Sequence, residues 1–96
     1  MFKVELIPIA EDEMSDAYDW YEEQSAGLGD RLYKEISHYL NLIEKKPLYF
    51  QVKYPGDVRA ATLKKFPYLI IYWIDEVNSL IIVLSIFHTS RRPKFF

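Results

Sequence analysis

The sequence contains no cysteine, only three glycines and only two histidines. Without cysteine the chain has neither a disulfide framework nor thiol chemistry, which is compatible with a reducing cytoplasm. So few thiol and imidazole groups argue against a tight transition-metal site, and we expect no metal and no cofactor. The apolar runs are shorter than the roughly 20 residues that a membrane helix needs. The stretch MFKVELIPIAEDEM also lacks the features of a signal peptide, so we expect a cytoplasmic protein outside the membrane.

Apolar and aromatic residues are abundant: half of the 96 residues are hydrophobic and 17% are aromatic. This composition supports a real core in one domain spanning residues 1–96. The charges are uneven. Residues 1–43 carry ten acidic and three basic side chains, a net charge of −7, whereas residues 44–96 carry four acidic and nine basic ones, a net charge of +5. This asymmetry indicates a basic binding face, or two halves that offset each other on one surface.

The spacing of apolar residues predicts a two-layer α+β domain. Residues 2–6 alternate as a short strand, residues 10–24 and 28–45 have helical spacing, and the glycines of GLGD separate the two helices. Four further segments, 48–54, 58–66, 67–74 and 80–88, alternate with short connections, which favours an antiparallel meander of three to four strands. We therefore expect an N-terminal strand, an antiparallel helical hairpin and this meander, with the helices on one sheet face.

The last two predicted strands are apolar on both faces. Strict alternation separates Leu69, Ile71 and Trp73 from Tyr68, Ile70, Tyr72 and Ile74 in the first strand, and Ile81, Val83 and Phe87 from Leu80, Ile82, Leu84 and Ile86 in the second. Two helices cover only one face of such a sheet. We therefore expect the other face to bind a partner, unless the sheet curls over it or the protein forms a homodimer.

A histidine and several cations near the strand ends form the candidate site. They are Arg59, Lys64, Lys65, His88, Arg91 and Arg92. Because the ends of antiparallel strands meet at one edge of a sheet, such a set is able to bind an RNA phosphate while His88 acts as a general base. The alternative is that Arg59 pairs with a carboxylate and the last residues form a solubilising tail. We expect His38, alone on its helix, to be a surface or boundary histidine.

Three stretches of the sequence have a familiar order and spacing. They are A-x6-A-x2-WYEEQ-x2-GLGDRL at 10–32, VRAATLKKFPYLIIYWI at 58–74 and VLSIFHTSRRP at 83–93. Together they resemble the RelE/ParE toxin superfamily, the toxins of bacterial type II toxin–antitoxin (plasmid stabilisation) systems. The resemblance implies the same α+β fold and a growth-inhibiting protein that a cognate antitoxin neutralises by wrapping it with a helix and an extended segment. Such an antitoxin would occupy the free sheet face.

The resemblance leaves the target open. ParE-like members poison DNA gyrase, and the WYEEQ and GLGDR stretches resemble that side of the superfamily. The basic residues Lys64, Lys65, Arg91 and Arg92 are then docking residues. RelE-like members cleave mRNA in the ribosome, and under that interpretation Arg59 holds a phosphate and His88 transfers a proton, so the protein is an enzyme only in this case. The third hypothesis is a non-toxic partner-binding protein of the same fold.

Overall fold

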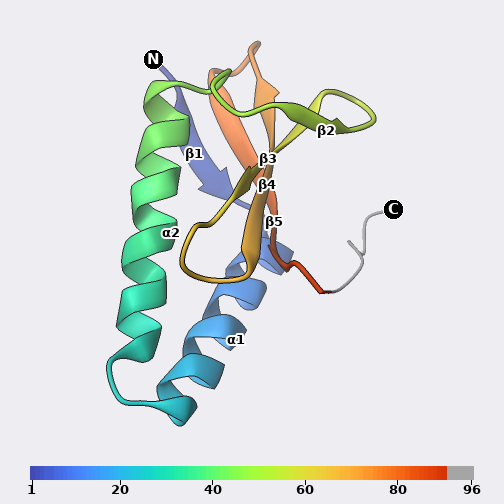
Figure 1. The fold of residues 1–96 in the computed structure, drawn as a ribbon. Helices are drawn as coiled ribbons and strands as arrows, with labels where there is room; N and C mark the ends of the chain where they lie inside the picture. The colour runs from blue at the N-terminus through green and yellow to red at the C-terminus, as the bar shows by residue number, and fades with distance from the viewer. Residues whose placement is uncertain (91–96) are drawn as a thin grey trace.

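The computed structural model, which describes residues 1–90, has a helical hairpin packed against a five-stranded sheet (Figure 1). The elements are β1 (Lys3–Leu6), α1 (Pro8–Gln24), α2 (Leu28–Lys45), β2 (Val52–Tyr54), β3 (Val58–Thr62), β4 (Tyr68–Asp75) and β5 (Leu80–His88). The predicted α+β class and the order of elements are confirmed. No helix within residues 1–90 has the length and the apolar character that crossing a membrane requires.

The sheet has the strand order β1-β5-β4-β3-β2. Strands β2 to β5 form the predicted antiparallel meander, and β1 pairs with β5 in parallel. The parallel pairing follows from the connection, because the helical hairpin carries the chain across the sheet before the meander begins. Two strands are shorter than predicted: β2 starts at Val52, and β3 ends at Thr62 where the chain turns toward β4.

The glycines of GLGD shape the turn between the helices. Gly27 has a φ of 87°, a left-handed conformation that glycine adopts without strain. A Cβ at Gly29 would lie 2.8 Å from the backbone oxygen of Tyr18, so only glycine lets the helices approach this closely. The carboxylate of Glu22 accepts hydrogen bonds from the Gly27 and Gly29 N–H groups at 3.2 and 2.9 Å, which satisfies free donors at the start of α2.

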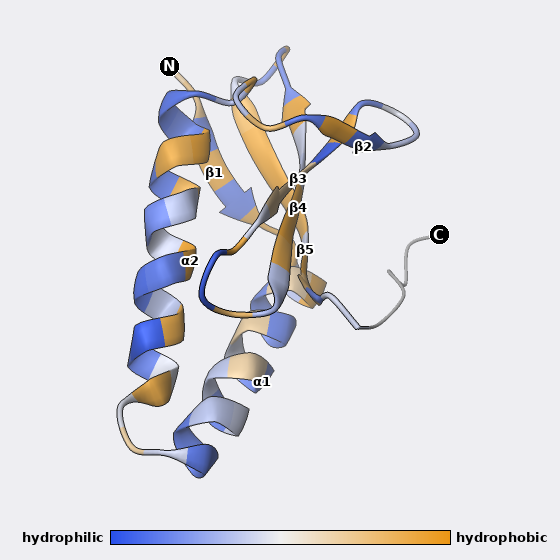
Figure 2. Cartoon of the chain, viewed as in Figure 1, coloured by the Kyte–Doolittle hydropathy of each residue, from blue (hydrophilic) through white to orange (hydrophobic). Residues whose placement is uncertain are grey.

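The main core lies between the hairpin and one face of the sheet. It is built from Ala10 and Ala17 of α1, Leu32, Ile36 and Ile43 of α2, and Ile70, Tyr72, Ile81, Val83 and Ile86 of the central strands. The helical spacing predicted for residues 28–45 thus places Leu32, Ile36 and Ile43 of α2 in the core. Figure 2 shows how the apolar positions concentrate in the central strands and recur at intervals along α2.

A β-bulge in β5 reverses part of the predicted alternation. Ile71 pairs with Ser85 and the next residue of β4, Tyr72, pairs with Val83, so Leu84 is the additional residue. Beyond the bulge the faces exchange, since one extra residue moves every following side chain to the other side. The prediction that placed Phe87 with Val83 is therefore wrong: Ile86 lies with Val83 against the helices, and Phe87 lies with Leu84 on the opposite face.

The bulge lies where β5 loses its partner β1. The pairing with β1 ends at Leu6 and Val83. One residue of α1 then takes over: Glu13 Oε1 accepts hydrogen bonds from Ser85 Oγ at 2.8 Å and from the Ile86 N–H at 3.2 Å. A carboxylate thus replaces the missing strand and satisfies two buried donors.

Candidate functional site

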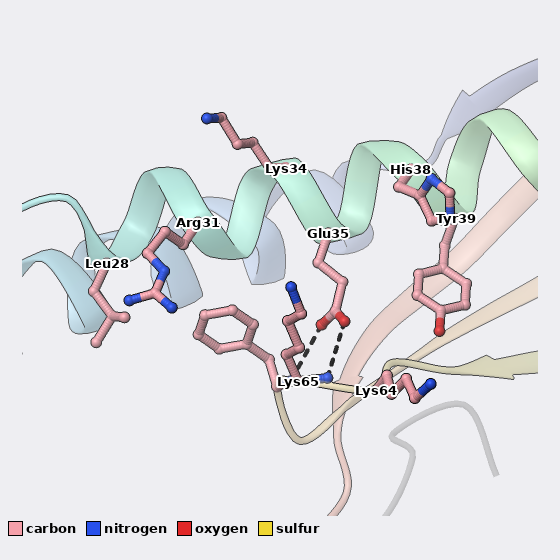
Figure 3. Close-up of a pocket in the computed structure, with 9 residues that line it drawn as sticks. Leu28, Arg31, Lys34, Glu35, His38, Tyr39, Lys64 and Lys65 are labelled. Atoms are coloured by element: carbon pink, nitrogen blue, oxygen red, sulfur yellow. Dashed lines mark hydrogen bonds between the residues drawn. The ribbon is translucent and has the colours of Figure 1, made fainter.

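An open groove of about 900 Å³ lies between the first half of α2 and the turn joining β3 to β4 (Figure 3). Its lining residues are Leu28, Arg31, Lys34, Glu35, His38, Tyr39, Lys64, Lys65 and Phe66. Lys64 and Lys65, two of the predicted binding residues, form one wall. Arg31 and Lys34 of α2 form the other and were not predicted, although their spacing with His38 at i, i+3 and i+7 places them on one helix face.

The only carboxylate in the lining of this groove, Glu35, is bound by the main chain. It accepts hydrogen bonds from the N–H groups of Lys65 at 2.9 Å and of Phe66 at 3.1 Å, drawn as dashed lines in Figure 3. These bonds fasten the β3–β4 turn to α2. Within residues 1–90, none of the four cations Arg31, Lys34, Lys64 and Lys65 forms an ion pair. All four are exposed, so their charge remains available to an anion.

His88 belongs to an aromatic cluster behind the groove. Its ring packs edge-on against Tyr68 at 5.2 Å, and Tyr21 connects Tyr68 to Phe66 with centroid distances of 6.3 and 5.1 Å. Burial raises the pKa of Tyr21 in this cluster. The Ser90 N–H and hydroxyl lie 3.3 and 2.7 Å from Nδ1 of His88. If the Ser90 N–H donates to Nδ1, the proton of the neutral ring is on Nε2.

Arg59 lies level with the middle of β4 and β5, away from the strand end at which His88 lies. Arg59 pairs with Tyr72 and His88 pairs with Tyr68, so four residues of β4 and two strand spacings separate them. The two Cα atoms are therefore roughly 16 Å apart. The expectation that the strand ends gather these cations thus holds for Lys64, Lys65 and His88 but fails for Arg59. In an antiparallel meander β3 and β5 run in the same direction, so the start of β3 lies away from the end of β5.

Arg59 binds a backbone carbonyl rather than the carboxylate considered as its partner. Its Nη1 donates a hydrogen bond to Phe50 O at 2.6 Å, which fixes the connection between α2 and β2. The neighbouring Tyr72 hydroxyl donates to Pro47 O in the same connection at 2.7 Å. Burial raises the pKa of Tyr72 to about 12, against the smaller opposing effect of the Arg59 charge. Two further predicted residues, Arg91 and Arg92, lie outside the described residues.

The sheet face turned away from the helices is apolar. Its centre consists of the buried residues Ala60, Ile71 and Phe87, surrounded by the half-buried residues Tyr54, Val58, Leu69 and Leu84. Trp73, which alternates with Tyr72 to this face, is 40% exposed. No helix of residues 1–90 contributes to this cluster, as the prediction of a sheet covered on one face requires.

The described part of the chain offers no metal site. Residues 1–90 contain no group of three His, Asp or Glu side chains that could hold a metal ion. His38 is exposed and lies beside the Tyr39 ring at 5.6 Å, which agrees with its prediction as a surface histidine. The candidate binding surfaces of residues 1–90 are therefore the basic groove and the apolar sheet face.

Comparisons with known proteins agree with this fold. The family model described as "ParE toxin of type II toxin-antitoxin system, parDE" matches residues 4–93. A chain of the solved structure "Chromosomal ParDE TA system from P. aeruginosa" superposes with a TM-score of 0.78 at 17% identity, over 92% of this chain and 96% of that one. No curated protein matches the sequence.

Proposed function

The chain belongs to the ParE toxin family of type II toxin–antitoxin systems, and from this premise we propose that it inhibits growth by acting on DNA gyrase and that a cognate antitoxin neutralises it. The site of action would then be the cytoplasm. The observation that carries the proposal is the apolar, helix-free face of the sheet, because the toxin of such a system needs a surface that its antitoxin covers.

The apolar face has the properties of an antitoxin-binding surface. Leu69 and Leu84 are half-buried and Trp73 is 40% exposed, so a bound helix or extended segment would remove their remaining apolar area from water. Fully burying one large side chain is worth about 1.5–3 kcal/mol. The solved structure of similar fold comes from a ParDE system, which also supports an antitoxin as the partner.

A substitution on this face tests the antitoxin. We expect Trp73→Asp to weaken copurification with the cognate antitoxin, while the growth effect of the toxin persists. Trp20→Asp is the matched control, since Trp20 is 56% exposed but lies on α1. Equal binding by the two variants would exclude this face, and a dimer of the toxin alone in light scattering would identify a second copy as its occupant.

The placement of Arg59 and His88 supports gyrase rather than mRNA as the target. A nuclease would need both side chains at one phosphate, but their Cα atoms lie roughly 16 Å apart, four residues along β4 and two strands across the sheet. Arg59 is also occupied by the carbonyl of Phe50. Both observations favour a toxin that acts by binding.

Pulse labelling after induced expression distinguishes the targets. Early loss of thymidine incorporation, together with inhibition of purified gyrase by the purified toxin, is the expected result. Early loss of amino-acid incorporation, abolished by Arg59→Ala or His88→Ala in folded protein, would replace the proposal with a ribosome-dependent nuclease. No growth effect would favour a non-toxic binding protein of the same fold.

A further inference from the structure

The groove between α2 and the β3–β4 turn concentrates positive charge on a protein whose net charge is −2. Arg31 and Lys34 belong to the α2 wall and Lys64 and Lys65 to the wall formed by the turn. In Figure 3, Arg31 and Lys65 point into the space between the walls, whereas Lys34 points to the outer side of α2. All four side chains are exposed, and none forms an ion pair with a residue in the range 1–90. Four unpaired cations that line one open groove form a basic surface suited to a polyanionic partner. A surface that contacts only solvent usually carries charges of both signs.

The position of Glu35 strengthens this electrostatic argument. A glutamate four residues after Arg31 on a helix is well placed for an ion pair. Instead, its carboxylate turns to the N–H groups of Lys65 and Phe66 at 2.9 and 3.1 Å. The arrangement holds the two walls together and leaves the guanidinium group of Arg31 unpaired among the described residues.

We propose that this groove binds the phosphate backbone of duplex DNA. That this DNA is the segment held by gyrase rests on the proposed function. The DNA contact itself does not depend on that function. Phosphate oxygens need only side-chain cations as partners, and the groove supplies them from two elements that are fixed to each other.

Two other anionic partners fit the groove less well. An acidic peptide normally adds main-chain hydrogen bonds, but the N–H groups of Lys65 and Phe66 are already bound by Glu35. Single-stranded nucleic acid requires aromatic faces for stacking. Of the three rings that line the groove, Tyr39 and Phe66 are half-buried and packed against the core, and only the imidazole of His38 is exposed. Duplex DNA, read only through its phosphates, requires neither.

The length of the groove sets the number of phosphates it contacts and therefore the salt dependence of binding. The α2 segment from Leu28 to His38 is roughly 15 Å long, the length of about four phosphate spacings along one strand. Four neutralised phosphates predict that log K falls with log salt concentration with a slope of about −3.6. Because this contact is purely electrostatic, we expect it to be independent of base sequence.

The test is the salt dependence of DNA binding by the purified full-length toxin without gyrase. Fluorescence anisotropy with a labelled duplex of about 20 base pairs measures affinity between roughly 50 and 200 mM salt. The double variant Lys64→Gln, Lys65→Gln should reduce the magnitude of the slope by about 1.8. Its backbone N–H groups remain available to Glu35, and circular dichroism confirms that the variant is folded.

The matched control is the double variant Lys45→Gln, Lys46→Gln. These two lysines are also adjacent and exposed, and they lie outside the groove at the other end of α2. We expect wild-type slope and affinity for it. Equal losses in both double variants, or no salt-dependent binding by the wild type, would overturn the proposal.

A glutamate-rich peptide of equal charge identifies the alternative partner. If it competes with labelled DNA as well as unlabelled duplex does, the groove takes an acidic protein segment and the DNA proposal fails. The outcome is separable from that of the proposed function, because thymidine incorporation and gyrase inhibition are measured independently. A toxin can inhibit gyrase without this DNA contact, and the contact can exist in a protein that does not inhibit gyrase.

Discussion

Replacing the half-buried Glu13 by alanine should destabilise the fold strongly, although Glu13 belongs to neither proposed binding surface. Its Oε1 accepts hydrogen bonds from Ser85 Oγ at 2.8 Å and from the Ile86 N–H at 3.2 Å. Ser85 and Ile86 are only 3% and 1% exposed, so water cannot easily replace the carboxylate. No strand replaces it either, because the pairing with β1 ends at Val83.

The magnitude follows from the two donors. A buried donor left without a partner costs about 1–3 kcal/mol, and partial access of water at the edge of the sheet lowers the sum. We therefore expect Glu13→Ala to reduce the free energy of unfolding by about 2–4 kcal/mol. For a domain of this size, the melting temperature should fall by roughly 8 °C or more.

Urea denaturation measures the effect, with a lower transition midpoint and an unchanged m value as the expected result. Glu23→Ala is the control, since Glu23 is an exposed glutamate of the same helix, and it should change stability by no more than about 0.5 kcal/mol. A double-mutant cycle with Ser85→Ala should show coupling of about 1 kcal/mol. If Glu13→Ala is as stable as Glu23→Ala, or the cycle is additive, the carboxylate does not replace the missing strand.

Three further substitutions test other parts of the structure. Tyr72→Phe should cost about 1 kcal/mol at neutral pH through its lost hydroxyl bond. Because burial raises the folded-state pKa of Tyr72 to about 12, wild-type stability should decline between pH ~10, the unfolded value, and pH 12, and Tyr72→Phe should weaken that decline in urea titrations. A decline of equal size in both proteins would contradict this assignment. Gly29→Ala should destabilise the protein by about 1–3 kcal/mol in thermal unfolding, because the new Cβ would lie 2.8 Å from Tyr18 O. The same substitution inside a helix usually stabilises a protein. A rise in melting temperature would therefore refute the close contact. Arg59→Ala should reduce the free energy of unfolding by about 1–3 kcal/mol, because the hydrogen bond to the Phe50 carbonyl is lost. The folded variant should still block thymidine incorporation. Loss of that block in a folded variant would show a direct role for the guanidinium.

The sequence alone determined the features that depend on local periodicity. The stripe that includes Leu32, Ile36 and Ile43 specified α2, since a helix buries residues three and four positions apart. Alternation specified the strands of the meander, and the glycines at 27 and 29 marked the turn between the helices. The prediction of an apolar face without a helix followed from the same alternation, because two helices cover only one side of such a sheet.

Only the tertiary structure decided how distant segments meet. The bulge at Leu84, the parallel pairing of β1 and the role of Glu13 depend on strand register, which no local pattern specifies once both faces of a strand are apolar. The groove likewise joins Arg31 to Lys65 through the hydrogen bonds of Glu35, across about 30 residues of sequence. Arg59 and His88 were separated for the same reason: the residue types suggested a site, but the register placed Arg59 level with the middle of β4 and His88 at the end of β5.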